Sequence, residues 1–182
     1  FRLYLTTAAL TIIFTFGYIY LSNYKDATTT LSKTERLFKR ANAGEAKAQN
    51  TIGTYYETGQ NVEKNLDTAI SWYKKAATQD YALAQLNLAV IEYRNKRYES
   101  AYPWFEKAAN LGNAEAQSFL GTMYFKGEGV DKDQNKAIKW FEQSSLNGDG
   151  ISQFYLGRVY YDNKDYNKAL EWYKKSSDRG VS

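Results

Sequence analysis

Apolar and polar side chains follow one another along most of this chain with the period of amphipathic helices. From residue 45 onward, apolar residues recur every three or four positions in short segments, separated by polar stretches rich in Gly, Asn and Asp. No segment shows the alternation of a strand, so the pattern predicts an all-α protein. The predicted helices form a first set over 45–58, 82–94, 114–126 and 150–162, and a second set over 67–79, 98–110, 134–147 and 166–178.

The first residues follow a different pattern. The segment "LYLTTAALTIIFTFGYIYLS", from Leu3 to Ser22, contains no charged residue, and as a helix it would span roughly 30 Å, the thickness of the hydrocarbon layer of a bilayer. Tyr24 and Lys25 follow it, as expected at a membrane boundary. We predict a transmembrane anchor over residues 1–24. A cleaved secretory signal is the alternative, but the run exceeds a usual signal core and no small-x-small cleavage pattern follows.

Small side chains share one face of this predicted helix: Thr7, Ala8, Thr11 and Thr15. Such a stripe lets a second membrane helix approach closely, and the threonine hydroxyls can form hydrogen bonds across the contact. Alternatively, each threonine bonds to a carbonyl of its own helix. These four residues are the candidate membrane-helix contact.

Charge is distributed unevenly along the chain. Residues 1–40 carry six of the 24 Lys and Arg but only two of the 20 Asp and Glu, so the remaining residues carry 18 of each sign. Nucleic-acid binding needs clustered positive charge, so no nucleic-acid partner is expected. Residues 25–44 are interpreted as a basic juxtamembrane segment followed by a capping helix, next to membrane lipid.

The side of the membrane stays open. The basic residues after the anchor favour the cytoplasm by the positive-inside rule, but long domains translocate largely regardless of charge. The absence of cysteine is compatible with either side of a bacterial membrane. We expect a single-pass protein of a bacterial inner membrane with residues 45–182 in the periplasm.

Two kinds of residue recur with one alternating period. Tryptophan stands at 72, 104, 140 and 172, and glutamine stands at 49, 85, 117 and 153. Four residues after each glutamine comes a very small residue: Gly53, Ala89, Gly121 or Gly157. Agreement between two markers predicts four repeats of two helices, stacked as a solenoid.

The markers also predict how the repeats pack. Each tryptophan lies on the same helical face as an alanine three residues earlier, so we predict that the tryptophans are buried between repeats. The small residues are predicted where the paired helix comes close. Pro103 is expected to delay or kink its helix. Ser32 and Glu35 form a capping-box pattern before "ERLFKRANAG", a helix that could cover the end of the stack.

Unit three reads "AQSFLGTMYFKGEGVDKDQNKAIKWFEQSSLNG" and unit one reads "AQNTIGTYYETGQNVEKNLDTAISWYKKAA". These segments resemble the Sel-one-like repeats, relatives of the tetratricopeptide solenoids, and the resemblance covers residues 42–180. Units two and four keep the tryptophan but lack the Gly-x-Gly-Val loop. The resemblance implies an α/α superhelical solenoid of about four helix-pair repeats, here preceded by the single transmembrane helix. Such a solenoid holds other macromolecules together rather than catalysing a reaction.

The sequence offers little chemistry. Cysteine and histidine are both absent, which excludes thiol nucleophiles, imidazole bases and ordinary zinc sites. Asp131, Asp133, Asn135 and Glu142 fall at four calcium-loop positions, but Lys136 occupies the position that needs glycine. Paired carboxylates such as Asp131 and Asp133 lie in polar loops, where nothing would raise a pKa for acid catalysis. We therefore expect no metal, no cofactor and no enzyme activity.

The remaining candidate for a functional site is a surface on the first helices of the repeats. On the first helix of each repeat, the residues three before, one after and four after the small residue form a stripe, which by the resemblance lines a concave groove. An alternative is that Leu86 and Phe154 pack between repeats. The stripe favours a non-enzymatic, membrane-anchored scaffold, an accessory or assembly subunit of a membrane protein complex; the alternative is a tethered periplasmic module that binds peptides or envelope fragments. The candidate groove residues are Asn50, Thr54, Glu57, Leu86, Val90, Tyr93, Ser118, Thr122, Phe125, Phe154, Arg158 and Tyr161.

Overall fold

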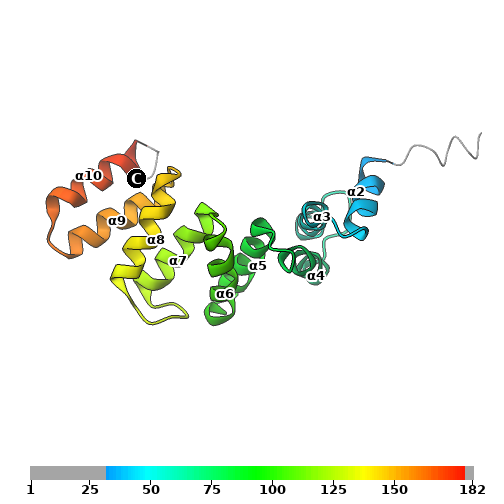
Figure 1. The fold of residues 1–182 in the computed structure, drawn as a ribbon, viewed down its shortest axis with the longest axis horizontal. Coiled ribbons are helices and arrows are strands. Elements are labelled where there is room, and N and C mark those ends of the chain that lie inside the picture. Colours follow the sequence, from blue (N-terminus) through cyan, green and yellow to red (C-terminus); the bar gives the residue numbers. More distant parts are fainter. Residues whose placement is uncertain (1–31, 179–182) are drawn as a thin grey trace, which may run out of the picture. The chain divides into compact units, whose positions relative to one another are not determined.

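The computed structural model describes residues 32–178, which are helical apart from short connections and contain no strand (Figure 1). This confirms the all-α prediction for that part of the chain. The helices are α2 (Lys33–Asn42), α3 (Ala46–Thr58), α4 (Leu66–Ala77), α5 (Ala82–Arg94), α6 (Tyr98–Asn110), α7 (Ala114–Lys126), α8 (Gln134–Leu146), α9 (Gly150–Asp162) and α10 (Tyr166–Ser177).

The predicted membrane anchor over residues 1–24, with its candidate contact residues, lies outside the described residues. Within residues 32–178, no helix combines the length and the apolar composition needed to cross a bilayer. The chain divides into two compact units, and the boundary after Lys39 falls inside α2.

The start of α2 has the predicted capping box. The Ser32 backbone N–H donates to the Glu35 carboxylate over 2.7 Å, and the Glu35 N–H donates to the Ser32 hydroxyl over 3.2 Å. The reciprocal bonds satisfy two amides that a helix leaves without intrahelical partners. Hydrogen bonds from Ser32 lower the pKa of the Glu35 carboxyl group.

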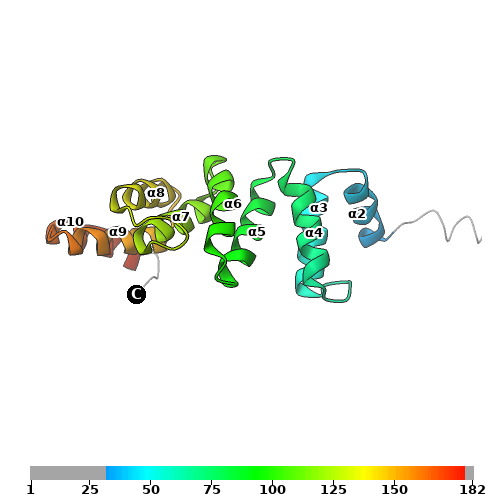
Figure 2. The same ribbon diagram turned by 90° about the horizontal axis from the view of Figure 1, so that it is seen from below.

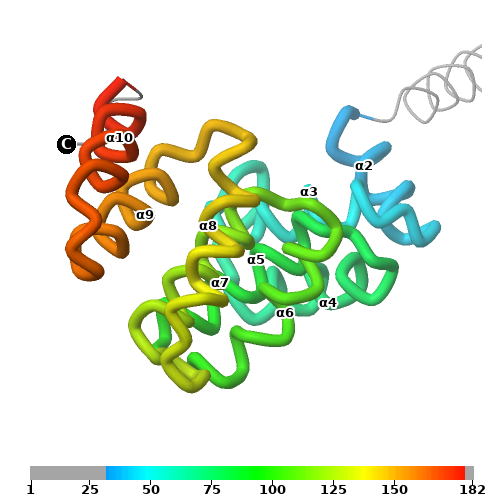
Figure 3. Tube along the Cα trace, turned by 60° about the vertical axis from the view of Figure 1, so that its left-hand side comes forward, coloured from blue at the N-terminus to red at the C-terminus, as the bar shows by residue number. Residues whose placement is uncertain are grey.

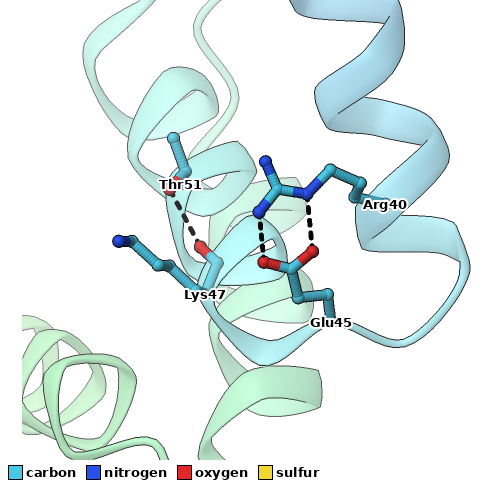
Figure 4. A network of polar contacts seen from close by, with 4 residues as sticks. All are labelled: Arg40, Glu45, Lys47 and Thr51. Carbon is cyan, nitrogen blue, oxygen red and sulfur yellow. Dashed lines mark hydrogen bonds and ion pairs between the residues drawn. The ribbon is translucent and has the colours of Figure 1, made fainter.

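An ion pair joins the two ends of the connection from α2 to α3. Arg40 Nε donates to the Glu45 carboxylate over 2.6 Å, and a second guanidinium nitrogen contacts the other carboxylate oxygen (Figure 4). Both side chains are largely exposed, so this bidentate pair contributes little net stability. Beyond it, the Thr51 hydroxyl bonds the Lys47 carbonyl within α3.

Helices α3 to α10 form four consecutive hairpins, α3/α4, α5/α6, α7/α8 and α9/α10 (Figures 1 and 2). The most extensive contacts are within each hairpin, and the second helix of each hairpin also packs on the first helix of the next (Figure 3). This is the order of a helical solenoid, in which each repeat contacts its neighbours. The predicted helix boundaries agree with the observed ones to within two residues.

The loops between the two helices of units one and three are longer than those of units two and four. They contain the residues that end the first helix and cap the second. Gly59 and Gly127 adopt left-handed conformations with φ of 83° and 79°, and close α3 and α7. Asn65 and Asp133 then cap α4 and α8 by accepting bonds from amides three residues on. Asp133 therefore serves as a helix cap in the segment that resembles a calcium loop.

The core combines small residues with one fully buried aromatic ring in each of the first three hairpins. The alanines at 69, 101, 137 and 169 are at most 2% exposed. The large buried rings are Tyr73, Phe105 and Phe141, each fully buried and each directly after a repeated tryptophan. The tryptophans themselves are half-buried. The prediction that the tryptophans are buried between repeats therefore holds only in part, because the fully buried ring is that of the next residue.

The half-buried tryptophans still pack between repeats. Trp104 lies against the buried clusters on both sides of α6, and Trp140 lies against those on both sides of α8. Lysines lie over two other repeated tryptophans: the Lys75 ammonium lies 4.0 Å from the centre of the Trp72 ring, and that of Lys175 lies 4.1 Å from the centre of the Trp172 ring. The indoles thus seal the repeat junctions at the surface.

The small residues lie where the prediction places them. A methyl group added at Gly53 would come within 2.6 Å of the Tyr73 ring, and one added at Gly121 within 2.5 Å of the Phe141 ring. No real Cβ approaches a ring this closely, so these positions require glycine while the ring keeps its place. The close approach of paired helices is confirmed.

One of the two effects expected of Pro103, a delayed helix start, is absent. Helix α6 begins at Tyr98, the position equivalent to Tyr166 at the start of α10, so the proline does not delay it. Pro103 lies exposed inside the helix. The helix continues through it to Asn110, and the missing N–H removes one intrahelical hydrogen bond.

The repeated glutamines bond neighbouring repeats together. The side-chain amides of Gln49, Gln85 and Gln117 each donate over 3.1 Å to the carbonyl eight residues earlier, at the end of the preceding helix. Gln79 adds a bond to the side-chain oxygen of Gln49. Gln85 and Gln117 have no such donor, and their side-chain oxygens are buried without a partner.

Candidate interaction groove

A cavity of about 300 Å³ opens between the first helices of units two, three and four. These are α5, α7 and α9, and α7 contacts α9 directly. Consecutive first helices thus share one surface, which we call the groove. The cavity is lined by Tyr93, Glu115, Ser118, Phe119, Thr122, Lys126, Asp149, Ile151 and Tyr155.

Three predicted groove residues line this cavity: Tyr93, Ser118 and Thr122. Ser118 and Thr122 form its polar floor, with only 7% and 8% of each residue exposed. The Ser118 hydroxyl is hydrogen-bonded to that of Ser152 over 3.0 Å. The Thr122 hydroxyl donates to the Ser118 carbonyl one turn back. Both hydroxyls of the floor therefore already have hydrogen-bond partners within the chain.

Other predicted groove residues pack inside the repeats. Leu86 is 5% exposed and belongs to a buried cluster, so packing between repeats is the correct interpretation for it. Val90 packs against the same cluster. The ring of Phe125 lies edge-on to that of Tyr155, with 5.6 Å between centres, and covers the next cluster along the stack.

In unit one the predicted stripe forms a hydrogen-bond network. Asn50 accepts a bond of 3.0 Å from the Asn87 amide across the repeat junction. The buried Tyr73 hydroxyl contacts Thr54 over 3.2 Å and donates to the Glu57 carboxylate over 2.6 Å. Burial, together with the Glu57 carboxylate, raises the pKa of the Tyr73 hydroxyl. This part of the groove surface is polar and already paired.

In unit four the predicted residues are exposed. Phe154 is 36% exposed and touches the rings of Tyr155 and Tyr173. Arg158 pairs with Asp162 one turn along the helix, over 3.3 Å. Tyr161 is 54% exposed. None of the three lines the cavity.

Sequence reasoning missed the aromatic residues that shape the cavity. Phe119 and Tyr155 stand two positions before the small residue, outside the predicted stripe. Phe119 stacks on the buried Phe105, with 4.6 Å between ring centres, and Tyr155 stacks on Phe141 with 5.2 Å. The signal was present in the sequence, because the position two residues before the small residue is aromatic in both unit three and unit four.

The edges of the cavity carry charge. Glu115 lies in the first turn of α7, and Asp149 caps α9 by accepting a 2.7 Å bond from the Ser152 amide. At the other end of α7, Lys126 pairs with Glu128 over 3.8 Å. The Glu128 carboxylate also accepts a bond from the Tyr93 hydroxyl. Burial and this carboxylate raise the pKa of the Tyr93 phenol.

Two further clefts lie away from the groove. One, of about 480 Å³, lies between α8 and α10 beside Lys139 and Trp172. The other, also about 480 Å³, lies between the end of α3 and the end of α5, beside Lys64 and Arg94. Neither is lined by more than one aromatic residue. Within residues 32–178, no group of three or more acidic, histidine or cysteine side chains is placed to hold a metal ion.

Nothing among the described residues shows catalytic activity at the groove. Its hydroxyls at Ser118 and Thr122 are bonded within the chain. Rigid aromatic rings with a charged rim are instead the features of protein interaction surfaces.

Comparisons with known proteins agree with this geometry. The Sel1 repeat matches residues 46–81, 114–149 and 150–181. A tetratricopeptide repeat matches residues 65–117, which include unit two. Among curated proteins, the chitin synthase regulator SKT5 of Saccharomyces cerevisiae is 49% identical over 39 residues, 21% of this chain and 6% of that protein.

Solved structures show the same fold. The protein c5321, a protective antigen of uropathogenic Escherichia coli with an SLR fold, is 35% identical with a TM-score of 0.77, over 82% of this chain and 34% of that one. A Sel1 repeat protein of Oxalobacter formigenes is 34% identical with a TM-score of 0.74, over 81% of this chain and 62% of that one. The chain thus spans about a third and three fifths of the lengths of these two proteins.

Sel1-repeat proteins are typically non-enzymatic scaffolds for protein–protein interaction. The repeat matches more than half of the sequence, and the helix pairs, the buried rings and the close glycine contacts recur at its period. The chain belongs to the Sel1 repeat family.

Proposed function

We propose that this protein is a membrane-tethered interaction scaffold whose groove holds a segment of a partner protein, as an accessory or assembly subunit of a membrane protein complex. The observation that carries the proposal is the cavity of about 300 Å³ between three successive first helices, with aromatic walls and a hydrogen-bonded floor. Rigid aromatic residues lose little conformational entropy on binding, which makes them effective contact residues.

The tether rests on the uncharged run from Leu3 to Ser22 and the tyrosine and lysine residues after it. Anchored in this way, the repeats meet a partner beside the membrane, where effective concentration strengthens a modest contact. We place the protein in a bacterial inner membrane with its repeats in the periplasm. Protease treatment of spheroplasts tests the side, because repeats in the periplasm would be degraded.

The binding experiment compares two arginine substitutions at equally exposed positions. Ile151 lines the cavity and is 53% exposed, whereas Leu170 lies on α10 outside it and is 54% exposed. The full-length chain is extracted in mild detergent, and the proteins that copurify are measured by mass spectrometry. We expect Ile151→Arg to reduce the retained partner about tenfold, equivalent to about 1.4 kcal/mol, and Leu170→Arg to leave it unchanged.

Equal retention by both variants would contradict a role for the groove. A monomer that retains no protein, even before substitution, would contradict the scaffold function. Capture of peptides or envelope fragments in place of a protein subunit would instead support a tethered binding module.

The anchor is tested separately with Ile12→Lys combined with Phe14→Lys. Each lysine at the centre of a transmembrane helix disfavours insertion by about 2.5–3.5 kcal/mol. We expect the wild-type chain to remain in membranes after carbonate extraction and the variant to be released. Release of the wild-type chain would contradict the tether while leaving the groove untouched.

A further inference from the structure

We propose that the groove cavity binds a cationic side chain, and that an arginine of the partner segment fits it best. This inference rests on the proposed function and adds the chemistry of the residue that is recognised. It combines the aromatic walls of the cavity with the carboxylates at its edge, which belong to different helices.

The walls offer ring surfaces that a cation can approach. Phe119 and Tyr155 each use one ring face to stack on a buried ring, Phe105 and Phe141 respectively. Stacking holds both rings in place, and both rings line the cavity. A third ring, Tyr93, lies edge-on to Phe119 with 5.3 Å between centres. Aromatic ring faces attract guanidinium and ammonium groups.

The carboxylates supply the opposite charge. Glu115 and Asp149 lie at the N-terminal ends of α7 and α9, and both line the cavity. In the described part of the chain, neither forms an ion pair with a lysine or arginine. Asp149 uses one carboxylate oxygen to cap α9, which leaves the other for a ligand.

The lysine of the cavity does not neutralise this charge. Lys126 stands at the opposite end of α7 from Glu115 and pairs with Glu128. Glu128 is further held by the Tyr93 hydroxyl. The lysine and its glutamate thus compensate each other, and an acidic excess remains at the N-terminal ends of α7 and α9.

The size and shape of the cavity favour arginine. A volume of about 300 Å³ is at the lower end of ligand pockets, which suits one long side chain rather than a folded peptide. The planar guanidinium group stacks on aromatic faces and presents a fork of donors to carboxylates, whereas the lysine ammonium is a compact, strongly hydrated charge.

The test uses the isotope-labelled full-length chain in detergent micelles and three blocked tripeptide probes. The probes are N-acetylated, C-amidated Gly-Arg-Gly, Gly-Lys-Gly and Gly-citrulline-Gly, and citrulline keeps the shape of arginine without its charge. We expect the arginine probe to bind at least about tenfold more tightly than the citrulline probe and to shift NMR signals of Phe119, Ile151 and Tyr155. The lysine probe should bind between the two.

Two variants define the carboxylate contribution. In Glu115→Gln combined with Asp149→Asn, both charges are removed, but asparagine still caps α9 as well as aspartate does. We expect this variant to bind the arginine probe about tenfold more weakly and to bind the citrulline probe unchanged. Glu63→Gln removes one exposed charge in the loop between α3 and α4, outside the cavity, and should have no effect.

Equal affinities for the arginine and citrulline probes would overturn the proposal, and so would arginine binding that the double variant leaves unchanged. These results are distinct from failure of the proposed function. If a partner is retained by the wild-type chain, lost by Ile151→Arg and unaffected by the double carboxylate variant, then the groove binds its partner through apolar contacts and only the inference about the cation is wrong.

Discussion

The first and third repeats share one backbone plan but present different surfaces. In unit one, the buried ring is Tyr73, and its hydroxyl ties Thr54 and Glu57 into a polar network. In unit three, the equivalent ring is Phe141, which has no hydroxyl and stacks on Tyr155 of unit four. Both rings are fully buried against a glycine of the paired helix.

The residue two positions before the small residue of the next repeat accounts for the difference. Asn87 occupies that position after unit one and pairs with Asn50, whereas Phe119 and Tyr155 occupy it after units two and three. One position per repeat therefore converts a paired polar surface into a pocket with aromatic walls. Repeat proteins can vary such positions without changing the inter-repeat core.

The largest expected effect is the loss of the stacked ring of unit three. Phe141→Ala removes a fully buried aromatic side chain and the support of Tyr155, so we expect a loss of about 3–5 kcal/mol in the free energy of unfolding. Urea denaturation followed by circular dichroism measures it. A loss below about 1 kcal/mol would mean that the ring does not support the pocket.

The close contact of Gly121 with that ring predicts the next effect. A methyl group in Gly121→Ala would lie 2.5 Å from the Phe141 ring, and overpacking of this kind destabilises by about 1–3 kcal/mol although alanine favours helices. If the ring is the obstacle, the substitution should be milder in a Phe141→Leu background. An equal loss in both backgrounds would point to a different cause.

The polar network of unit one predicts a smaller effect. Tyr73→Phe makes the unit-one ring resemble that of unit three and leaves the Glu57 carboxylate without its donor. Hydrogen bonds to charged groups contribute about 1.5–3 kcal/mol, and exposure of Glu57 to water should place the loss at the lower end. Thermal unfolding at neutral pH measures the change. A more stable variant would show that the network does not stabilise this repeat.

The same tyrosine gives a pH dependence. The pKa of Tyr73 is raised in the folded protein, so its contribution is complete below the unfolded-state pKa of about 10 and is lost as pH rises above that value. The free energy of unfolding should therefore decline less steeply above pH 10 in Tyr73→Phe than in the wild-type chain. Identical slopes would show that Tyr73 ionises equally readily in both states.

The smallest effect concerns the glutamines that link repeats. Gln79 satisfies Gln49 in unit one, but Leu111 holds the equivalent position in unit two, where the Gln85 side-chain oxygen is buried without a partner. Leu111→Gln should supply that bond and stabilise by about 0.5–1.5 kcal/mol. Leu111 is 52% exposed, so little apolar burial is lost. Destabilisation would show that a glutamine at position 111 does not bond to Gln85 as Gln79 bonds to Gln49.

Periodicity was enough to predict the helices and their pairing because both depend on residues that recur in every repeat. Gly53 and Gly121 could be placed at helix contacts for the same reason. The inward-facing residue was harder to identify, since Trp72 and Tyr73 are adjacent aromatics that lie only about 100° apart around the helix. The sequence favours the larger ring, but the buried position opposite Gly53 is occupied by the smaller ring of Tyr73.

The groove was predicted less well because a stripe defined on one helix ignores the neighbouring repeats. Ser118 and Thr122 line the cavity, but Leu86, which is equivalent to Ser118, is buried between units two and three. Phe119 reaches the surface by stacking on Phe105, a residue of the preceding unit. Such contacts between side chains of different helices are not contained in the spacing of residues along either one.

The most direct test of the central claim compares the two halves of the groove by photo-crosslinking. A photoreactive amino acid replaces either Ile151, at the aromatic cavity, or Asn50, in the paired polar half, in the full-length chain within native membranes. The account predicts one partner protein crosslinked at position 151 and little or none at position 50. Crosslinking at position 50 with none at 151 would contradict it.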